Sequence, residues 1–286
     1  MATVYLNGQF MPAEQAMVPV LDRGFIFGDG VYEVIPVYGG HLFRLDQHLE
    51  RLQNSLEATR ISNPLSHEQW HNMLSQLVQH NGDGDQSLYL QITRGVAKRD
   101  HAFPANTTPT LFAMSNPLIT PPVAQLAQGV TAITVDDIRW QNCHIKAISL
   151  LPNILLRQQA IDAGSVEAIL IRDGQATEGA ASNLFIVKDN TVITPPKGPL
   201  LLPGITRDLI LELAHANNIA AKETTISRAD LASADEVWLS SSTKEILPVT
   251  RLDDRPVGNG EPGPLWRRML TLFQEYKQKL RTGEQE

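Results

Sequence analysis

The chain has 286 residues, of which 42% are hydrophobic and 19% are charged, a composition typical of a folded protein with room for about two domains. Its 24 basic and 31 acidic residues give a net charge of −7, which argues against a nucleic-acid-binding protein because phosphate binding needs a clustered basic surface. The single cysteine, Cys143, excludes an intramolecular disulfide and a multi-cysteine metal centre, and it fits a reducing compartment.

The first part of the sequence predicts an α+β arrangement. Apolar and polar residues alternate in short stretches, as in strands, and Gly39-Gly40 predicts a hairpin turn. Leucines at helical spacing predict a helix over 42–61, and Ser66 is a candidate N-cap for a second helix that ends at Asn81-Gly82. The expected strands are 4–6, 31–38, 87–93 and 110–115. Two consecutive helices between runs of strands favour an α+β layer over a strictly alternating βαβ pattern.

The proline-rich segment 116–122 divides the sequence, because its prolines resist both helix formation and sheet pairing. Beyond it, apolar runs and helical periodicity predict a second set of elements. Strands are expected near 130–138, 166–172, 183–188, 191–194 and 236–241, and helices at 150–163, 205–217, 228–233 and 264–280. We therefore expect an N-terminal domain over 1–117, a linker over 118–123 and a C-terminal domain over 124–286.

Lysine is scarce in this sequence: only eight of the 24 basic residues are lysines, and none precedes Lys98. A lysine in apolar surroundings is a candidate for Schiff-base chemistry, because desolvation lowers its pKa and frees the nucleophilic amine. Most of the lysines stand in polar or turn contexts, and Lys277 and Lys279 are expected to face water on the C-terminal helix. Lys146 instead lies in an apolar stretch that leads into a helix. The alternative is a side chain that extends its amine to the surface.

A segment of small residues over 176–185 carries one carboxylate, Glu178, and one amide, Asn183, between two expected strands. Small residues let a flat ligand approach the backbone closely. The alternative interpretation is a tight turn that joins the strands.

Two further segments are candidates for binding phosphate. Leu202 to Asp208 opens a predicted helix, whose free amides and dipole favour an anion, although a plain helix cap explains it equally well. The hydroxyls of 240–243 follow an expected strand and form either a second phosphate-binding edge or a polar loop. The Gly-Lys-Ser/Thr order of a P-loop is absent. Taken together, one amine, one acid and two phosphate-binding edges match the needs of pyridoxal phosphate.

At this point the sequence resembles the fold-type IV pyridoxal phosphate enzymes, and within them the D-amino acid transaminases most closely. The resemblance extends over nearly the whole chain through ordered motifs. They are 22–33, 48–52, 137–140, the segment around Lys146, 178–183, 204–208 and the hydroxyl cluster 240–243. The resemblance implies a two-domain fold that combines α+β and α/β features. Its smaller N-terminal α+β domain is followed by a larger C-terminal domain with a β-barrel-like core and flanking helices.

The resemblance also implies roles at the cofactor ring. Lys146 is similar to the catalytic lysine that bonds covalently to pyridoxal phosphate and later shuttles the proton. Glu178 is similar to the acid at the pyridine nitrogen, Leu202 to the apolar residue packed on the ring, and Arg139 to an arginine near the ring hydroxyl. Ala180 departs from the family, in which serine is common near this position.

The same resemblance implies how the cofactor phosphate is held. Arg51 is similar to the family's phosphate-binding arginine, and Ile205 with Thr206 to the phosphate-binding start of a helix. Ser241 and Ser242 are similar to the second phosphate-binding edge. No metal ligand is expected at this site.

For the substrate, the Arg99-Asp100-His101 segment resembles the Arg-X-His pair that holds the α-carboxylate in D-amino acid transaminases, with Tyr32 as the third member. A guanidinium grips a carboxylate through two parallel hydrogen bonds. From the residues alone, the preferred interpretation of Arg99 is a solvated loop charge. Val34 is similar to a residue that lines the side-chain pocket. Because the neighbouring subunit contributes to this site in the family, the resemblance implies a homodimer.

The implied reaction is ping-pong transamination of D-amino acids with 2-oxo acids, with D-alanine and 2-oxoglutarate giving pyruvate and D-glutamate. The alternatives are a branched-chain L-amino acid transaminase, which usually lacks the Arg-X-His pair, an aminodeoxychorismate lyase, or a catalytically idle cofactor-binding protein. No apolar run approaches the roughly 18 residues that span a membrane, and the N-terminus carries no signal core. We therefore expect a cytoplasmic enzyme that acts on small molecules and binds neither membrane nor nucleic acid.

Overall fold

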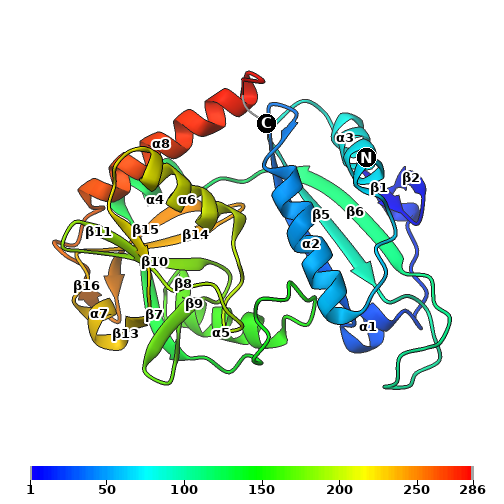
Figure 1. The fold of residues 1–286 in the computed structure, drawn as a ribbon, viewed down its shortest axis with the longest axis horizontal. Helices are drawn as coiled ribbons and strands as arrows, with labels where there is room; N and C mark the ends of the chain where they lie inside the picture. The colour runs from blue at the N-terminus through cyan, green and yellow to red at the C-terminus, as the bar shows by residue number, and fades with distance from the viewer. Residues whose placement is uncertain (1, 285–286) are drawn as a thin grey trace. The chain divides into compact units, whose positions relative to one another are not determined.

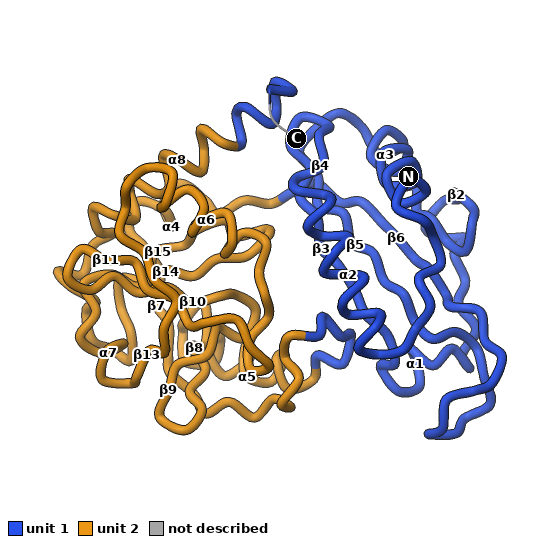
Figure 2. The backbone as a smooth tube through the Cα atoms, viewed as in Figure 1, with its two compact units in different colours: residues 1–118, 145–150, 277–286 blue, residues 119–144, 151–276 orange. Residues whose placement is uncertain are grey.

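The structure is a computed structural model, which describes residues 2–284. Its contacts divide the chain into two compact units (Figure 2). Unit 1 comprises residues 1–118, 145–150 and 277–286, and unit 2 comprises residues 119–144 and 151–276. The short segment 145–150, which carries Lys146, thus belongs to the same unit as the N-terminal strands and helices. The domain boundaries at 117 and 124 stay a prediction.

Unit 1 is built on a six-stranded sheet in the order β2-β1-β6-β5-β3-β4, in which all neighbouring strands are antiparallel. The strands are β1 Thr3–Leu6, β2 Gln9–Pro12, β3 Gly30–Tyr38, β4 His41–Leu42, β5 Gln86–Thr93 and β6 Thr110–Pro117. The four strands expected from the sequence are confirmed. β6 extends two residues into the proline-rich segment 116–122 and ends at Pro117, because a proline at the end of a strand interrupts little of the ladder.

Two helices, α2 (Leu45–Thr59) and α3 (His67–His80), pack on one face of this sheet (Figure 1). Their apolar stripes share one core cluster with Val31 and Ile35 of β3 and with the inward residues of β5. Ser66 caps α3 by accepting the backbone N–H of Gln69, whose side chain in turn accepts the N–H of Ser66. Both predicted helices and the predicted cap are confirmed. A 3-10 turn (Ala13–Gln15) and the short α1 (Arg23–Phe27) complete the regular structure between β2 and β3.

Unit 2 contains a ten-stranded mixed sheet in the order β12-β11-β10-β14-β15-β7-β8-β9-β13, with β16 beside β15. The strands are β7 Val130–Asp136, β8 Glu167–Arg172, β9 Gln175–Gly179, β10 Asn183–Lys188, β11 Thr191–Thr194, β12 Ala221–Glu223, β13 Ile226–Ser227, β14 Glu236–Ser241, β15 Glu245–Leu252 and β16 Arg255–Pro256. β9 and β10 are not neighbours in this order, yet they contact each other. The sheet is therefore curled, and the short turn 180–182 joins strands from its two halves.

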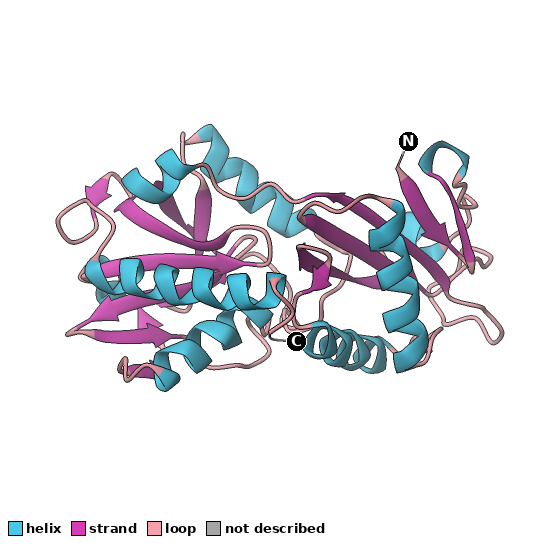
Figure 3. Cartoon of the chain, turned by 90° about the horizontal axis from the view of Figure 1, so that it is seen from above, coloured by secondary structure: helices cyan, strands magenta, loops and turns pink. Residues whose placement is uncertain are grey.

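Helices flank the curled sheet (Figure 3). They are α4 Val123–Gln128, α5 Leu151–Asp162, α6 Ile205–Ala216, α7 Arg228–Ala232 and α8 Pro264–Arg281. The last four were predicted to within two residues, whereas α4 begins inside the expected linker. An α+β unit and a unit with a barrel-like sheet and flanking helices confirm the predicted fold class. Over residues 2–284 no helix has both the length and the apolar character needed to cross a membrane.

The end of α8 corrects one prediction about lysine. Lys277 was expected to face water, but it is only 4% exposed, and its Nζ lies 4.5 Å from the centre of the Tyr38 ring. The reason is that the described residues from 277 to 284 belong to unit 1, so this side chain lies over a buried aromatic face. Lys279 is exposed, as expected.

Candidate active site

Lys146 is held in unit 1 by hydrogen bonds of its own backbone. Its carbonyl accepts the N–H of Tyr32 at 2.9 Å, and its N–H donates to Oγ of Ser55 at 3.2 Å. The side chain is half-buried, and Nζ lies 4.1 Å from the centre of the Tyr32 ring. The amine is therefore fixed beside an aromatic face between β3 and α2, which differs from a side chain that simply extends into water.

One face of β3 presents Tyr32 and Val34, which alternate with the buried residues of the strand. Tyr89 of β5 pairs with Val34 in register and stacks on Tyr32, with ring centres 5.8 Å apart. Burial, assisted by Tyr32, raises the pKa of Tyr89 to about 12, so its hydroxyl remains a proton donor at neutral pH. The sequence analysis missed Tyr89, although its position opposite Val34 follows from pairing of the two predicted strands.

Arg51 forms a buried ion pair with Glu33, a partner that the sequence analysis also missed. Its Nε and one terminal nitrogen donate to the two oxygens of Glu33 at 2.8 and 2.7 Å. His48 approaches the same carboxylate through Nδ1 at 2.8 Å. Burial opposes ionisation of Glu33, but Arg51 and His48 outweigh it and hold the pKa of this carboxyl well below its usual range. Among residues 2–284, the buried Nε2 of His48 has no hydrogen-bond partner.

Arg99 and His101 lie in the exposed loop between β5 and β6, and both are close to Phe27 of α1. The Cζ of Arg99 and the ring centre of His101 are each 5.4 Å from the centre of the Phe27 ring. Buried Arg23 anchors the loop by donating to the carbonyl of Asp100 at 2.6 Å. The structure thus groups Arg99 with His101, whereas Tyr32 makes its ring contacts with Lys146 and Tyr89.

In unit 2, Glu178 lies within β9 (Gln175–Gly179), and the tight turn considered for this segment is confined to residues 180–182, between β9 and β10. One carboxylate oxygen accepts the N–H of Leu202 at 3.1 Å and the amide of Asn183 at 3.2 Å. The other oxygen accepts a short hydrogen bond from Arg139. Burial raises the pKa of Glu178 to about 7, although Arg139 acts in the opposite direction. The carboxyl is therefore close to the balance between its charged and neutral forms at neutral pH.

Arg139 is shared between two carboxylates. Its Nε and one terminal nitrogen donate to Asp137, each at 2.9 Å, in addition to its contact with Glu178. Arg172 donates to the carbonyl of Arg139 at 2.7 Å and pairs with Asp137 at 3.1 Å. Burial opposes ionisation of Asp137, but these two arginines keep its pKa below the ordinary value. Asp137 belongs to the motif 137–140, but its role as a partner of Arg139 was not predicted from the sequence.

The predicted phosphate-binding edges lie on two elements that pack together, α6 and β14. α6 begins at Ile205 after Gly204, which provides no side-chain cap, so the first backbone amides are not capped in this way. A Cβ at Gly204 would lie 1.9 Å from Oδ1 of Asn183, so any other residue here would require Asn183, whose amide bonds to Glu178 and Leu202, to shift. Thr206 is in the first turn of α6, as predicted.

Ser241 ends β14, and Ser242 follows it in the turn to β15. Oγ of Ser241 accepts the N–H of Lys244 at 3.2 Å. The neighbouring Ser240 is buried, and its Oγ has no hydrogen-bond partner among residues 2–284. A hydroxyl in that condition is a candidate to bind a group from outside the protein.

The residues of each unit, taken by itself, suit a part of the cofactor that the resemblance implies. A carboxylate has about four lone-pair positions, and Glu178 uses three of them, on Arg139, Asn183 and Leu202, which leaves one for a ring N–H. The uncapped start of α6 suits a phosphate. Lys146 presents a half-buried amine. The assignment of roles to these residues stays a prediction.

Comparisons with known proteins are consistent with these features. The family model described as amino-transferase class IV matches residues 30–252. The D-alanine aminotransferase of Bacillus licheniformis is 43% identical over 271 residues, which cover 95% of each chain.

Two solved structures of branched-chain amino acid aminotransferases are similar to the chain. A branched-chain amino acid aminotransferase of Escherichia coli has a TM-score of 0.93 at 30% identity, over 99% of this chain and 96% of the other. A T.th. branched-chain amino acid aminotransferase with pyridoxamine 5'-phosphate has a TM-score of 0.91 at 26% identity, over 98% and 94% of the two chains.

Proposed function

The chain belongs to the amino-transferase class IV family, and from that premise we propose that it transfers amino groups between D-amino acids and 2-oxo acids with pyridoxal 5'-phosphate as cofactor. The observation that carries the choice of D-amino acids is the 43% identity to a D-alanine aminotransferase over 95% of both chains. D-alanine and 2-oxoglutarate, giving pyruvate and D-glutamate, are the proposed pair of substrates.

When bound, pyridoxal phosphate supplies a carbonyl that condenses with amines and a ring that withdraws electrons from the substrate α-carbon. Lys146 is the proposed catalytic residue: its Nζ would hold the cofactor covalently and would serve as the general base that accepts the substrate α-proton. Hydrogen bonds to β3 and α2 fix the backbone of this lysine, which limits the positions that Nζ can reach. A general base is effective only when it is positioned within hydrogen-bond reach of its proton.

Glu178 is proposed to hold the ring nitrogen protonated, and Arg139 keeps this carboxyl in its charged form more often than burial alone would allow. Leu202 is proposed to cover the ring. Its backbone N–H also orients Glu178.

For the phosphate, we propose Arg51, the first amides of α6 with Ile205 and Thr206, and the hydroxyls of Ser241 and Ser242. Amides at a helix start and a guanidinium both favour an anion.

Arg99, His101 and Tyr32 are proposed to bind the substrate α-carboxylate, and Val34 to line the side-chain pocket. The grouping of Arg99 and His101 around Phe27, with the loop anchored by Arg23, supports a joint role for the pair. A homodimer and a cytoplasmic location complete the proposal. Light scattering coupled to size-exclusion chromatography and fractionation of cells test these two points.

Branched-chain L-amino acid transamination is the second candidate, because the structural similarity to the Escherichia coli branched-chain enzyme is high. A single-turnover experiment separates the two. Purified enzyme loaded with pyridoxal phosphate is mixed with D-alanine, L-alanine or L-leucine without a 2-oxo acid. We expect the absorbance band of the lysine-bound cofactor to convert to that of pyridoxamine phosphate with D-alanine only. Conversion with L-leucine only would refute the proposal in favour of the second candidate.

A further inference from the structure

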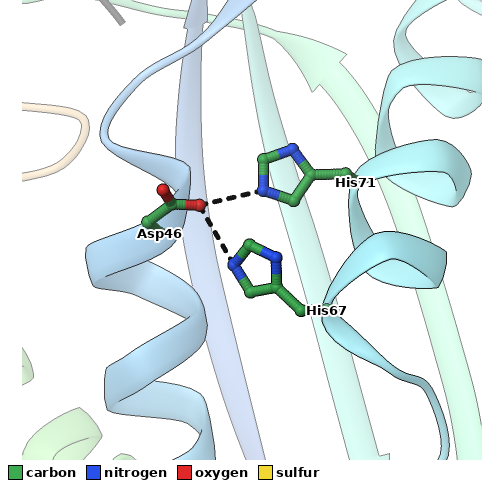
Figure 4. Close-up of side chains that lie close together, drawn as sticks. All are labelled: Asp46, His67 and His71. Carbon is green, nitrogen blue, oxygen red and sulfur yellow. Dashed lines mark hydrogen bonds and ion pairs between the residues drawn. The ribbon is translucent and has the colours of Figure 1, made fainter.

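Three side chains of unit 1 that the proposed reaction does not use converge on its surface (Figure 4). Asp46 is in the first turn of α2, His67 is the first residue of α3, and His71 follows one helical turn later. Nε2 of His71 and Nε2 of His67 lie 2.9 and 3.1 Å from the same oxygen, Oδ1 of Asp46. Between 42% and 69% of each of the three side chains is exposed, so the cluster is open to ions from solution.

The donor atoms already have nearly the spacing of a zinc coordination sphere. With metal–ligand distances of about 2.0–2.1 Å, two ligands of a tetrahedral zinc ion are about 3.3 Å apart. The two distances to Oδ1 of Asp46 are 0.2 to 0.4 Å shorter than that, and all three donor atoms lie within 4.8 Å of one another. Small rotations of exposed side chains are enough to admit the ion.

We propose that Asp46, His67 and His71 form a zinc-binding site. Two imidazoles and one carboxylate suit zinc and its transition-metal neighbours, whereas magnesium and calcium prefer a full set of oxygen ligands. Histidines four residues apart on a helix project from the same side, as in the helical zinc motifs. In the zinc-bound site, Nε2 of each imidazole binds the metal and carries no hydrogen. The one proton of each neutral ring is therefore on Nδ1. Because both rings are partly exposed, Nδ1 donates to water.

The surroundings of the cluster suit a cation that keeps one open position. A surface pocket of about 460 Å³, formed by α2, α3 and the segment between them, includes Asp46 and His67 in its wall. Glu50 lines the same pocket, and Glu68 lies in the first turn of α3. These carboxylates offset the positive end of the α3 dipole near His67. A water molecule from the pocket completes the coordination of the metal.

Zinc at this site connects the first turn of α2 to the first turn of α3. An ion that binds the folded chain more tightly than the unfolded chain raises its stability. The site is thus a structural clamp on the helical layer of unit 1. No metal ligand was predicted from the sequence, because Asp46 is distant in the sequence from the two histidines and only the fold brings the three side chains together.

Titration calorimetry tests the site with zinc chloride and the full chain loaded with pyridoxal phosphate, in the absence of amine substrates. We expect one zinc ion per chain and a higher midpoint of thermal unfolding. Loss of a residue that only supports a metal ligand costs roughly 10–100-fold in affinity. The double variant His67→Gln/His71→Gln, which removes two ligands, should weaken zinc binding by at least roughly 100-fold. His215→Gln, which changes an exposed histidine of α6, is the matched control and should bind zinc normally.

Cobalt(II) provides a second measurement, because its visible ligand-field bands report nitrogen and oxygen ligands directly. The bands should appear with the wild-type chain and vanish in the double variant. If the double variant has an altered far-ultraviolet circular dichroism spectrum, His71→Gln alone carries the same comparison. Equal zinc affinity in wild type and variant, no zinc binding by the wild type, or equally tight binding of magnesium would each overturn the proposal.

Discussion

Replacing Glu33 by glutamine should strongly destabilise the cofactor-free protein, because it removes the negative charge that two hydrogen bonds join to the buried guanidinium of Arg51. Glu33 has 0% and Arg51 has 7% of its side chain exposed, and two hydrogen bonds of 2.8 and 2.7 Å join them. At a charge separation of about 4 Å and an effective dielectric constant of about 20, their attraction is roughly 4 kcal/mol. Breaking a buried pair by removing one partner typically costs about 3–5 kcal/mol.

The assay is urea unfolding of the cofactor-free Glu33→Gln variant at pH 7.5, compared with wild type and with Glu57→Gln. Glu57 is an exposed glutamate of α2, the helix that carries Arg51, and its change should alter the free energy of unfolding by less than about 0.5 kcal/mol. We expect a loss of about 3–5 kcal/mol for Glu33→Gln. A loss below about 1 kcal/mol would refute the reasoning, because exposed pairs are worth no more than that.

The pH dependence of this loss follows from the direction of the Glu33 pKa shift. The pKa of Glu33 in the folded chain is held below its ordinary value, so its contribution to stability is complete above the ordinary pKa of a glutamate. The contribution disappears only as the pH falls through the lowered value. The difference between wild type and Glu33→Gln should therefore be the same at pH 6 and pH 8. A difference that halves between these two values would show that another group, such as His48, determines the stability of the cluster.

The other predictions concern the proposed cofactor and substrate residues. Lys146→Ala should abolish the absorbance band of the lysine-bound cofactor, and a retained band would move the covalent role to another lysine. Arg99→Ala should raise KM for D-alanine by roughly 10-fold or more, as expected for loss of a charge-assisted contact of about 1.5–3 kcal/mol, with cofactor affinity unchanged; unaltered kinetics would remove Arg99 from the substrate site. Gly204→Ala places a Cβ 1.9 Å from Oδ1 of Asn183, so equilibrium dialysis should show weaker binding of pyridoxal phosphate, and wild-type affinity would contradict the tight fit. Arg139→Met should raise the pKa of Glu178 above about 7, which shifts the acidic limb of the kcat profile to higher pH; an unshifted limb would mean that Glu178 does not control activity.

Much of the fold was predictable because periodicity reports burial directly. Leu45, Leu49, Leu52 and Leu56 recur at helical spacing, and all four are buried in α2. Ser66 was identifiable as a cap because its hydroxyl bonds within one turn of the chain. Such signals are local, and the structure retains them.

The sequence missed strands whose residue composition does not mark them as strands. β9 carries Glu178 and consists largely of small or polar residues, so no alternation of apolar residues marks it as a strand. It exists because β8 and β13 pair with it on either side. The same limit applies to β15, where Pro248 lies inside a strand and contradicts its intrinsic propensity.

The site residues that were missed have different causes. Asp137 lies only two positions before Arg139, and Tyr89 follows from the pairing of two predicted strands, whereas Glu33 contacts Arg51 between two elements, and a single sequence contains no measure of that distance. Glu33 looked like an ordinary alternating residue of a strand, yet it lies 18 positions before its partner Arg51 and contacts it in the core of unit 1. Only the packing of α2 on β3 brings the two together.

These partners change how cofactor binding is to be understood. Glu33 already neutralises Arg51, and Asp137 shares Arg139 with Glu178. The charged side chains that are proposed to bind the cofactor therefore form ion pairs with protein groups in its absence. An unpaired charge in these buried positions would destabilise the fold. The consequence is that Arg51 attracts a phosphate less strongly than a free arginine does, since Glu33 repels the same anion. The amides at the start of α6 and the hydroxyls after β14 must then supply a large share of the phosphate affinity. Glu33→Gln should accordingly lose less stability in the presence of pyridoxal phosphate than in its absence, because the phosphate replaces the missing negative charge.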